Sequence, residues 1–281
     1  MPPLPRLRSL LFVPGDRPER MEKALGLGAD ALILDLEDAV AATAKPAART
    51  AIRAFLDAHG SDGPALFVRV NPLDSAFVAD DLAALDGAAM HGVVLPKAEG
   101  GASVVNLRAR LSGDYRILPI ASETARAVFT LGSYEGDGLA GLTWGAEDLP
   151  AAIGAVTSRE ADGSYTDPYR VVRALTLFGA HAAGVPAIET VYPDFRDLDG
   201  LAAYAARGRR DGFTGMMAIH PAQVPVINSA FSPSAGEIAH ARAVVDLFAA
   251  NPGAGALQLD GKMVDAPHLK AAQRLLAAAG E

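Results

Sequence analysis

The 281-residue chain contains no cysteine. This absence excludes disulfide bonds, thiolate metal sites and a cysteine nucleophile, and it is consistent with a reducing cytosol. No run of apolar residues approaches the roughly 18 that a membrane-spanning helix needs. The apolar run near the N-terminus, Leu10–Val13, is too short for the core of a signal peptide. We therefore expect a cytoplasmic protein that does not cross a membrane.

Basic residues are too few for a general nucleic-acid-binding protein. Lysine and arginine number 25 against 33 aspartates and glutamates, a net charge of −8, whereas such proteins normally show a basic excess. A small anionic ligand needs only a local basic pocket and stays compatible with this charge. With 50% hydrophobic and 21% charged residues, the chain reads as an ordinary globular protein. Its length allows one large α/β domain or two smaller ones.

Short apolar segments alternate with helical patterns along most of the chain. Eight segments are expected as strands: Leu7–Val13, Ala31–Leu36, Ala65–Val70, Gly92–Leu95, Arg116–Ala121, Leu139–Trp144, Val185–Val191 and Gly215–Ile219. Eight short strands separated by helices are typical of a (β/α)8 TIM barrel. A doubly wound open sheet is the alternative, but no G-x-G-x-x-G motif follows the first strand.

About sixty residues follow the last expected strand, more than a barrel needs to close. They contain helical patterns over Ala235–Ala250 and Pro267–Ala279, with the Gly/Pro-rich stretch Asn251–Gly255 between them. We assign residues 1–228 to the barrel and 229–281 to a helical extension that covers a barrel mouth, its own or a neighbour's. The polar, turn-rich segment Ser158–Pro168 is expected to be a mobile loop over the site.

Two of the expected strands lead into a carboxylate. Glu123 follows one of them in ILPIASETA, and Asp148, 25 residues later, follows the next in GLTWGAEDL. Because the C-terminal ends of parallel strands gather on one face, the two side chains are expected to meet there. Mg²⁺ takes hard oxygen ligands and keeps several waters, so two carboxylates suffice as the protein's share. The sequence therefore predicts a magnesium site.

Other charged residues fall at strand ends as well. Arg17 follows the first strand, Glu37 and Asp38 end the second, and Arg69 ends the third. Arg69 offers a rigid, permanently charged fork for a carboxylate or for an enolate oxygen. Glu37 and Asp38 can hydrogen-bond metal-bound waters or orient Arg17 and Arg69. Such a site suits cleavage or formation of a carbon–carbon bond next to a carbonyl.

Three further residues invite a catalytic interpretation that the pattern does not favour. His220 lies beside a proline at the end of the eighth strand, where a structural hydrogen bond explains it at least as well as catalysis. Lys97 is a poor candidate for a Schiff base, because a metal-held enolate makes an imine unnecessary. Trp144 is expected to pack around the sixth strand and not on a cofactor.

Nine motifs in order carry a family resemblance. They are LLFVPGDRPERMEKA, LILDLEDAV, FVRVNPLDS, VVLPKAE, ASETA, TWGAEDL, ETVYPDF, GFTGMMAIHPAQV and GKMVDAP. From Leu10 to Pro267 the chain resembles the citrate lyase β-subunit-like (CitE-like) proteins of the HpcH/HpaI aldolase superfamily. The resemblance implies a TIM barrel, a homotrimer and a Mg²⁺-dependent lyase. The substrates implied are 3-hydroxyacyl thioesters such as malyl-CoA, citramalyl-CoA or citryl thioesters.

The resemblance also implies roles for individual residues. Glu123 and Asp148 match the Mg²⁺ ligands, and Glu123 also contacts the substrate. Arg69 matches the arginine that binds substrate and stabilises the enolate. Asp265 matches an acid/base residue that comes from the C-terminal segment of a neighbouring subunit. Lys23, with Arg17 close enough to help, matches a basic position near the CoA moiety.

Two positions depart from the family pattern. Met216 stands where relatives usually carry lysine, and Glu189 stands where they usually carry aspartate. The first departure removes a charge near the barrel mouth and is expected to alter the grip on CoA phosphates or on an acyl carrier. The second lengthens a carboxylate arm by one methylene. Neither affects the expected metal pair.

The implied reaction splits a hydroxyacyl thioester into an acyl thioester and an α-keto acid. Arg69 stabilises the leaving enolate and Asp265 protonates it, a role that depends on a pKa raised by burial. Three alternatives stay open: a citrate lyase β subunit acting on citryl-acyl carrier protein, a malate-synthase-like condensation, and a non-catalytic protein that binds a thioester or keto acid. The joint presence of the metal pair, Arg69 and Asp265 weighs against the last.

Overall fold

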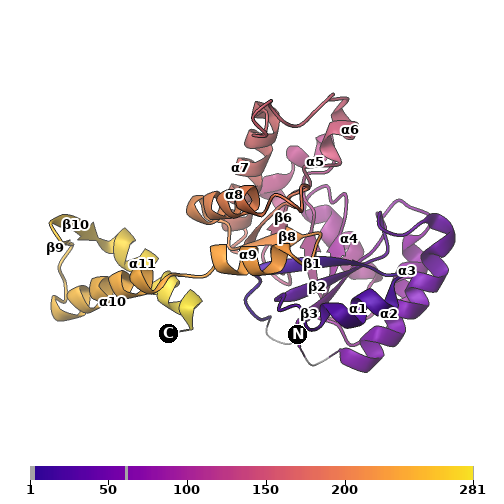
Figure 1. Ribbon diagram of the computed structural model, residues 1–281, viewed down its shortest axis with the longest axis horizontal. Helices are drawn as coiled ribbons and strands as arrows, with labels where there is room; N and C mark the ends of the chain where they lie inside the picture. Colours follow the sequence, from indigo (N-terminus) through magenta and orange to yellow (C-terminus); the bar gives the residue numbers. More distant parts are fainter. Residues whose placement is uncertain (1–3, 61–62, 281) are drawn as a thin grey trace. The chain divides into compact units, whose positions relative to one another are not determined.

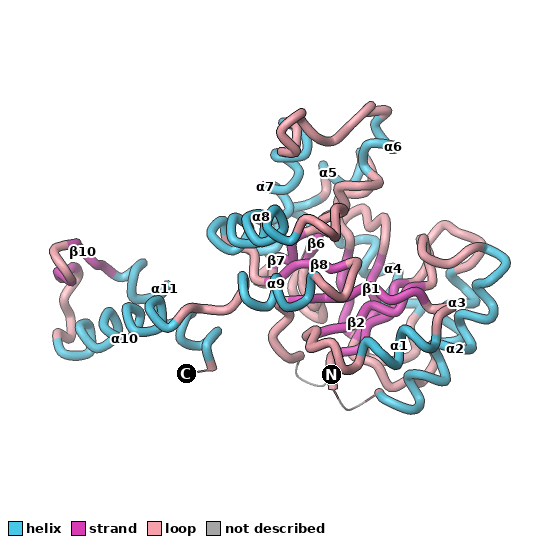
Figure 2. The backbone as a smooth tube through the Cα atoms, in the orientation of Figure 1, coloured by secondary structure: helices cyan, strands magenta, loops and turns pink. Residues whose placement is uncertain are grey.

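The computed structural model describes residues 4–60 and 63–280. These residues fall into two compact units, with the division between Ala230 and Phe231. In the first unit the strands lie at the centre and helices surround them (Figures 1 and 2). The eight parallel strands are β1 (Ser9–Pro14), β2 (Ala31–Asp35), β3 (Ala65–Arg69), β4 (Gly92–Leu95), β5 (Arg116–Pro119), β6 (Leu142–Thr143), β7 (Ala187–Glu189) and β8 (Gly215–Ala218).

The eight-stranded sheet closes on itself. Its strands are neighbours in the order β5-β4-β3-β2-β1-β8-β7-β6, and each pairing is parallel. Its two end strands meet through parallel bridges that pair Ile117 with Leu139 and Ile120 with Thr143. The N–H of Ala121 donates to the carbonyl of Thr143 at 2.8 Å. The first unit is therefore a TIM barrel, which confirms the predicted fold.

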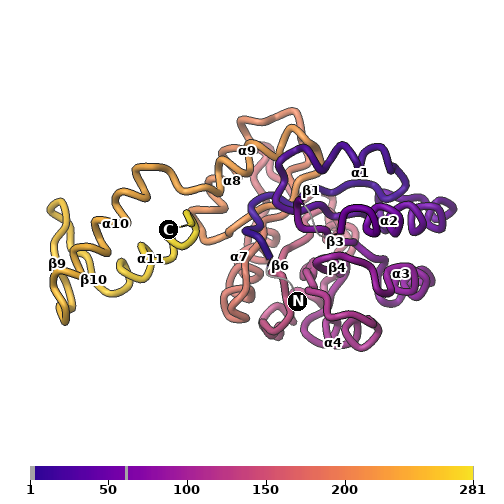
Figure 3. The backbone as a smooth tube through the Cα atoms, turned by 90° about the horizontal axis from the view of Figure 1, so that it is seen from below, coloured from indigo at the N-terminus to yellow at the C-terminus, as the bar shows by residue number. Residues whose placement is uncertain are grey.

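Helices follow the strands in alternation. They are α1 (Pro18–Ala24), α2 (Lys45–His59), α3 (Val78–Ala84), α4 (Gly101–Arg110), α5 (Ala125–Val128), α6 (Leu149–Ile153), α7 (Asp167–Ala182), α8 (Leu198–Asp211) and α9 (Gln223–Ala230), with short 3₁₀ turns at Ala42–Ala44 and Leu131–Ser133. Figure 3 shows α1, α2 and α3 succeeding one another around the barrel. In α2 the buried residues Ala48, Ile52, Phe55 and Leu56 recur at helical spacing, so one face packs on the sheet.

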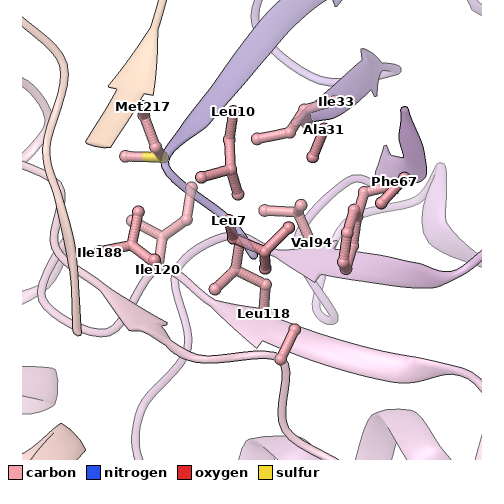
Figure 4. Close-up of a cluster of buried hydrophobic side chains, with 12 residues drawn as sticks. Leu7, Leu10, Ala31, Ile33, Phe67, Val94, Leu118, Ile120, Ile188 and Met217 are labelled. Carbon is pink, nitrogen blue, oxygen red and sulfur yellow. The ribbon is translucent and has the colours of Figure 1, made fainter. Parts of the chain in front are cut away.

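Apolar side chains from alternate strand positions fill the barrel interior. Figure 4 shows Leu10, Ile33, Phe67, Val94, Leu118, Ile188 and Met217 converging there. Successive strand side chains point to opposite faces, so the inward positions recur every second residue. Ile33 and Phe67 are inward, and the next inward positions along their strands are Asp35 and Arg69. The same period that builds the core therefore carries two charged side chains to the C-terminal mouth.

The second unit consists of α10 (Ala235–Ala250), a hairpin of β9 (Ala256–Leu259) and β10 (Lys262–Asp265), and α11 (Ala266–Ala279). Its core gathers Ala241, Val244, Val264 and Ala272. Ser234 and Glu237 form a capping box at the start of α10. Both helices match the predicted ranges, but the sequence pattern gave no strands here. The overlooked signal was Asp260-Gly261, whose two positive φ angles suit a two-residue type I′ turn.

Some barrel elements also differ from the expected ranges. β6 and β7 are shorter than expected, and Pro186, which has no N–H to donate, immediately precedes β7. The sequence pattern predicted no counterparts for the short helices α6 and α9, which follow β6 and β8.

Within residues 4–60 and 63–280, no helix is long and apolar enough to span a bilayer.

Candidate active site

A cavity of about 400 Å³ opens at the C-terminal mouth of the barrel, the face on which TIM-barrel enzymes carry their sites. The predicted residues Asp38, Arg69, Glu123 and Asp148 all line it. Asp35, Glu147, Thr190 and Met217 line it as well. The structure thus brings the expected metal pair and the expected arginine to one place.

Arg69 is fixed by carboxylates on several sides. Its Nε and Nη2 donate to the two oxygens of Asp35 at 2.7 and 2.6 Å. Its Nη1 lies 2.8 Å from Oε2 of Glu37 and 3.7 Å from a carboxylate oxygen of Asp38. Burial opposes the charge of Arg69, but the hydrogen bond to Asp35 and the nearby carboxylates outweigh it and raise its pKa. The guanidinium is therefore permanently charged and held in one orientation.

Asp35 is the functional residue that the sequence pattern missed. The pattern gave the task of orienting Arg69 to Glu37 and Asp38, but the bidentate partner is Asp35, which also accepts N–H bonds from Glu37 and Ala39. Asp38 is mostly exposed and more distant from Arg69. The period of two along β2, counted from Ala31 and Ile33, could have identified Asp35 as inward-facing.

Arg17 does not join this arrangement. It is exposed, and its ion pair in the described structure is with the neighbouring Asp16 at 3.8 Å. The expectation that Glu37 or Asp38 orients Arg17 was therefore wrong. The physical reason is position: Arg17 caps the start of α1, past the turn that ends β1, and its side chain is turned to solvent.

Lys97 connects this arginine cluster to the expected metal ligands. Its Nζ donates to Oε1 of Glu37 at 2.6 Å and lies 3.5 Å from Oδ1 of Asp148. Its backbone N–H donates to Oε2 of Glu123 at 2.5 Å. Burial opposes the charge of Lys97, but Glu37 and the other carboxylates outweigh it and raise its pKa. A raised pKa disfavours the neutral amine that an imine requires, in line with the prediction.

The expected metal ligands differ in environment. Glu123 is buried, and this burial raises its pKa to about 8, with Asp148 and Glu37 adding to the shift and the Lys97 N–H opposing it. Asp148 is 34% exposed. Gly145 lies so close to Glu123 that a Cβ at residue 145 would be 2.4 Å from Cγ of Glu123. The sequence thus leaves a glycine where the Glu123 side chain needs the space.

These donors fit a Mg²⁺ ion. A buried carboxylate with an unfavourable charge stands with a partly exposed one on the same cavity, and both offer hard oxygen ligands. Across the described ranges, no three His, Asp or Glu side chains converge as a complete protein cage. A bound Mg²⁺ would therefore complete its coordination with water or substrate oxygens, which is its usual habit.

Glu189 and Met216 lie away from the cavity. Glu189 is fully buried, and its carboxylate accepts hydrogen bonds from Trp144 Nε1, from the Thr190 N–H and from Arg173 on α7. Met216 is buried beside Glu189 in the β7–β8 register. The expectation that methionine in place of lysine at position 216 removes a charge near the barrel mouth was wrong, because Met217 takes the inward position and Met216 is buried facing outward.

Trp144 packs as expected. It is buried and lies edge-on to Tyr165 at 5.2 Å between ring centroids. Tyr165 belongs to the loop Ser158–Pro168, where the guanidinium of Arg159 bonds to the Tyr165 hydroxyl and to the carbonyl of Gly163. Arg159 also lies 3.9 Å from Glu147, so this loop borders the cavity. Its mobility stays a prediction.

A second cavity of about 440 Å³ lies along β1, α1 and the end of β8. It is lined by Arg20, Lys23 and His220 and shares Phe12, Pro14 and Ile219 with the first cavity. Arg17 is not among its lining residues. His220 stacks on Phe195 and accepts the N–H of Ala222 through Nδ1. These contacts favour the structural interpretation of His220.

Asp265 belongs to the second unit, at the start of α11. Its Oδ1 lies 2.5 Å from Nδ1 of His268, and this hydrogen bond lowers the pKa of Asp265. Within one chain, the pKa is therefore shifted opposite to the burial-raised value that the proposed acid needs. The reason is that His268 stabilises the charged form of a carboxylate that is partly exposed to water.

Residues 8–221 match the family model HpcH/HpaI aldolase/citrate lyase. The chain belongs to this family. The match covers the barrel with both expected metal ligands, and it confirms the resemblance that the nine motifs indicate.

Full-length relatives carry related names. A citrate lyase subunit beta-like protein of Mycobacterium tuberculosis is 41% identical over 271 residues, covering 96% of this chain and 95% of that protein. A (3S)-malyl-CoA thioesterase of Cereibacter sphaeroides is 36% identical, covering 97% and 94%. The human mitochondrial citramalyl-CoA lyase is 33% identical, covering 96% of this chain and 84% of that protein.

Among solved structures, a CitE protein of Mycobacterium tuberculosis in complex with magnesium, acetoacetate and coenzyme A is 40% identical. It has a TM-score of 0.83 and covers 98% of each chain. The similarity thus extends over both units of this chain and agrees with the barrel and helical C-terminal region described above.

Proposed function

We propose that this family member is a Mg²⁺-dependent carbon–carbon lyase. It cleaves or forms a 3-hydroxyacyl-CoA such as malyl-CoA, citramalyl-CoA or citryl-CoA, with an acyl-CoA and an α-keto acid on the other side of the reaction. The observation that carries the proposal is the shared cavity of Glu123, Asp148 and the fixed Arg69. Similarity to a citramalyl-CoA lyase and to a CitE complex with magnesium and coenzyme A supports it.

The residues divide the chemistry among them. Glu123 and Asp148 would hold Mg²⁺, which as a Lewis acid polarises a keto or hydroxyl oxygen of the substrate. Asp35 uses two of the five N–H groups of Arg69 and leaves others for a substrate oxygen. Because Arg69 is already oriented, it can stabilise a developing enolate without reorganisation. The carboxylates of Glu37 and Asp38 lie beside Nη1 of Arg69 and help to hold the guanidinium in place.

The second cavity is the proposed place of the CoA moiety. Lys23 and Arg20 put two positive charges on its lining, and it adjoins the first cavity at Phe12 and Ile219. Positively charged side chains at such a site can bind the phosphate groups of CoA, and the exposed Arg17 is close to them in the sequence.

We further propose a homotrimer in the cytoplasm in which Asp265 serves the site of a neighbouring subunit. Burial there would move its pKa in the direction that a general acid needs.

A coupled assay tests the proposal. The purified protein is given MgCl₂ with malyl-CoA, citramalyl-CoA, 3-hydroxy-3-methylglutaryl-CoA or citryl-CoA, and both α-keto acid and free thiol are measured. Wild type is compared with Asp148→Ala and with Asp80→Ala, which removes a carboxylate that is 71% exposed and does not line the cavity. We expect the wild type to release keto acid. The rate of release should fall by about 10³-fold in Asp148→Ala and should stay unchanged in Asp80→Ala.

The two readouts separate the alternatives. Release of free thiol without keto acid would show that the protein is a thioesterase and not a lyase. No release from any CoA ester, together with turnover of citryl-acyl carrier protein, would assign the chain to a citrate lyase β role. Acetyl-CoA and glyoxylate in the reverse direction test the condensation. Binding of keto acid without any turnover would contradict an enzyme altogether.

A further inference from the structure

Five charged side chains of alternating sign cross the mouth of the barrel. In order they are Asp35, Arg69, Glu37, Lys97 and Asp148, and we call them the mouth ion chain. Its contacts are 2.6 Å from Arg69 to Asp35, 2.8 Å from Arg69 to Glu37, 2.6 Å from Glu37 to Lys97 and 3.5 Å from Lys97 to Asp148. The mouth ion chain joins Arg69 to Asp148, one of the proposed metal ligands.

Lys97 is the member of this chain that touches both proposed metal ligands. Its ammonium reaches Asp148, and its backbone N–H reaches Glu123. The backbone of Lys97 has a φ of 50°, in the left-handed region that is unfavourable for most residues other than glycine. Residues in such conformations persist only where surrounding contacts compensate for the strain. The contacts of Lys97 with three carboxylates supply that compensation.

Of its two side-chain partners, Glu37 holds the ammonium of Lys97 more closely than Asp148 does. Its distance to Glu37 is shorter than its distance to Asp148, and Glu37 is buried. A divalent cation on Asp148 would repel the ammonium, which could then rely on Glu37 alone without losing its closest partner. Two cations competing for one carboxylate weaken each other's binding.

We propose that Lys97 is the resident counter-ion of the metal site. It neutralises Asp148 and Glu37 while Mg²⁺ is absent, and it lowers the affinity for Mg²⁺ so that the ion stays exchangeable. This inference rests on the proposed function, because it takes Glu123 and Asp148 as the metal ligands. Lys97 acts on the metal through these carboxylates and is a positioning residue.

The test is Mg²⁺ binding to the full-length, EDTA-treated protein without substrate, at constant ionic strength. Calorimetric titration with MgCl₂ and the thermal midpoint with and without MgCl₂ are measured for wild type and Lys97→Gln. Arg126→Gln is the matched control, since it removes one positive charge whose partner is Glu99 and not a proposed ligand. Lys97→Arg is the conservative variant that retains the charge.

For Lys97→Gln we expect Mg²⁺ to bind about tenfold more tightly or better, because a unit charge next to a divalent cation has been removed. The thermal midpoint without Mg²⁺ should fall, since the carboxylates lose their counter-ion, and the Mg²⁺-induced rise should grow. Arg126→Gln and Lys97→Arg should stay within about threefold of wild type. A merely structural role of Lys97 would instead weaken Mg²⁺ binding.

A second variant keeps the inference testable if Lys97→Gln does not fold. Glu37→Gln removes the closer partner of Lys97 and should leave the ammonium on Asp148, so Mg²⁺ should bind at least about tenfold more weakly. If the wild type binds Mg²⁺ but Lys97→Gln binds it equally or more weakly, or Glu37→Gln binds it equally, the counter-ion role is overturned. If the wild type binds no Mg²⁺, either alone or with a keto acid, the metal site of the proposed function is itself overturned.

Discussion

Asp35 shows how much a single side chain can decide at this site. It forms a buried, bidentate pair with Arg69 and also accepts two backbone N–H groups of the following turn. The same carboxylate therefore shapes the turn after β2 and aims the arginine. Glu123 shows a similar dependence, since its side chain occupies the space that Gly145 leaves open.

Asp35→Asn is expected to weaken both stability and activity. The substitution removes one partner of a buried ion pair, which typically costs about 3–5 kcal/mol. Arg69 loses its orientation but not its charge, so kcat should fall more than substrate affinity. Urea denaturation and lyase kinetics measure the two effects. Asp80→Asn, at an exposed ion pair, should change either quantity little; equal effects of the two variants would contradict the role of Asp35.

Gly145→Ala is expected to impair catalysis without unfolding the protein. The new Cβ would lie 2.4 Å from Cγ of Glu123, so the proposed metal ligand has to move. Displacement of about 1 Å at a site can cost about 10²-fold in rate. The control is Gly236→Ala, where the added Cβ meets open space in α10. Full activity of Gly145→Ala would show that Glu123 need not stay where the structure has it.

At the scale of the elements, the pairing between the N-terminal ends of β3 and β4 depends on a histidine. Nδ1 of His91 accepts the N–H of Leu66 at 3.1 Å, while the backbone N–H of His91 donates to the carbonyl of Leu66. Burial lowers the pKa of His91, which agrees with a neutral ring that acts as acceptor. The start of two barrel strands is thus tied by a side chain that binds its partner only when unprotonated.

This arrangement predicts a pH dependence of stability. The folded state holds a lowered pKa, so the unfolded chain binds the proton first and the free energy of unfolding rises with pH in that window. The His91 contribution should be complete above about pH 6.5 and decline as the pH falls from there toward the lowered folded-state pKa. Urea denaturation from pH 5 to 8 should show His91→Gln losing part of this acid decline. The exposed His240→Gln serves as control; identical acid limbs for wild type and His91→Gln would contradict the prediction.

At the scale of the whole molecule, the chain consists of a barrel and a second unit with its own core. The barrel carries the proposed metal ligands and Arg69, while Asp265 belongs to the second unit. In a homotrimer of the proposed kind, each site takes its acid from another chain. The division into units is consistent with that arrangement. The lowered pKa of Asp265 in the single chain is a shift that burial against a neighbouring subunit would have to reverse.

Complementation between two inactive variants tests this arrangement. Asp148→Ala and Asp265→Asn should each lack lyase activity alone. Co-expressed, they form mixed oligomers in which some sites combine an intact Asp148 with an intact Asp265 from a neighbour. Random mixing predicts recovery of about a quarter of wild-type activity. Failure to recover activity in oligomers shown by mass spectrometry to be mixed would place Asp265 in its own chain's site or outside catalysis.

The sequence by itself determined the barrel, the positions of Glu123, Asp148 and Arg69, and the family. These depend on local signals: apolar segments of strand length, carboxylates at strand ends and motifs in order. Only the tertiary structure decided that Asp35 holds Arg69, that Lys97 bridges Glu37 to Asp148, and that Glu189 and Met216 face away from the cavity. The physical reason is distance along the chain. Such contacts join residues tens of positions apart, and which side chains meet across the mouth follows from strand register and closure, which no local pattern records.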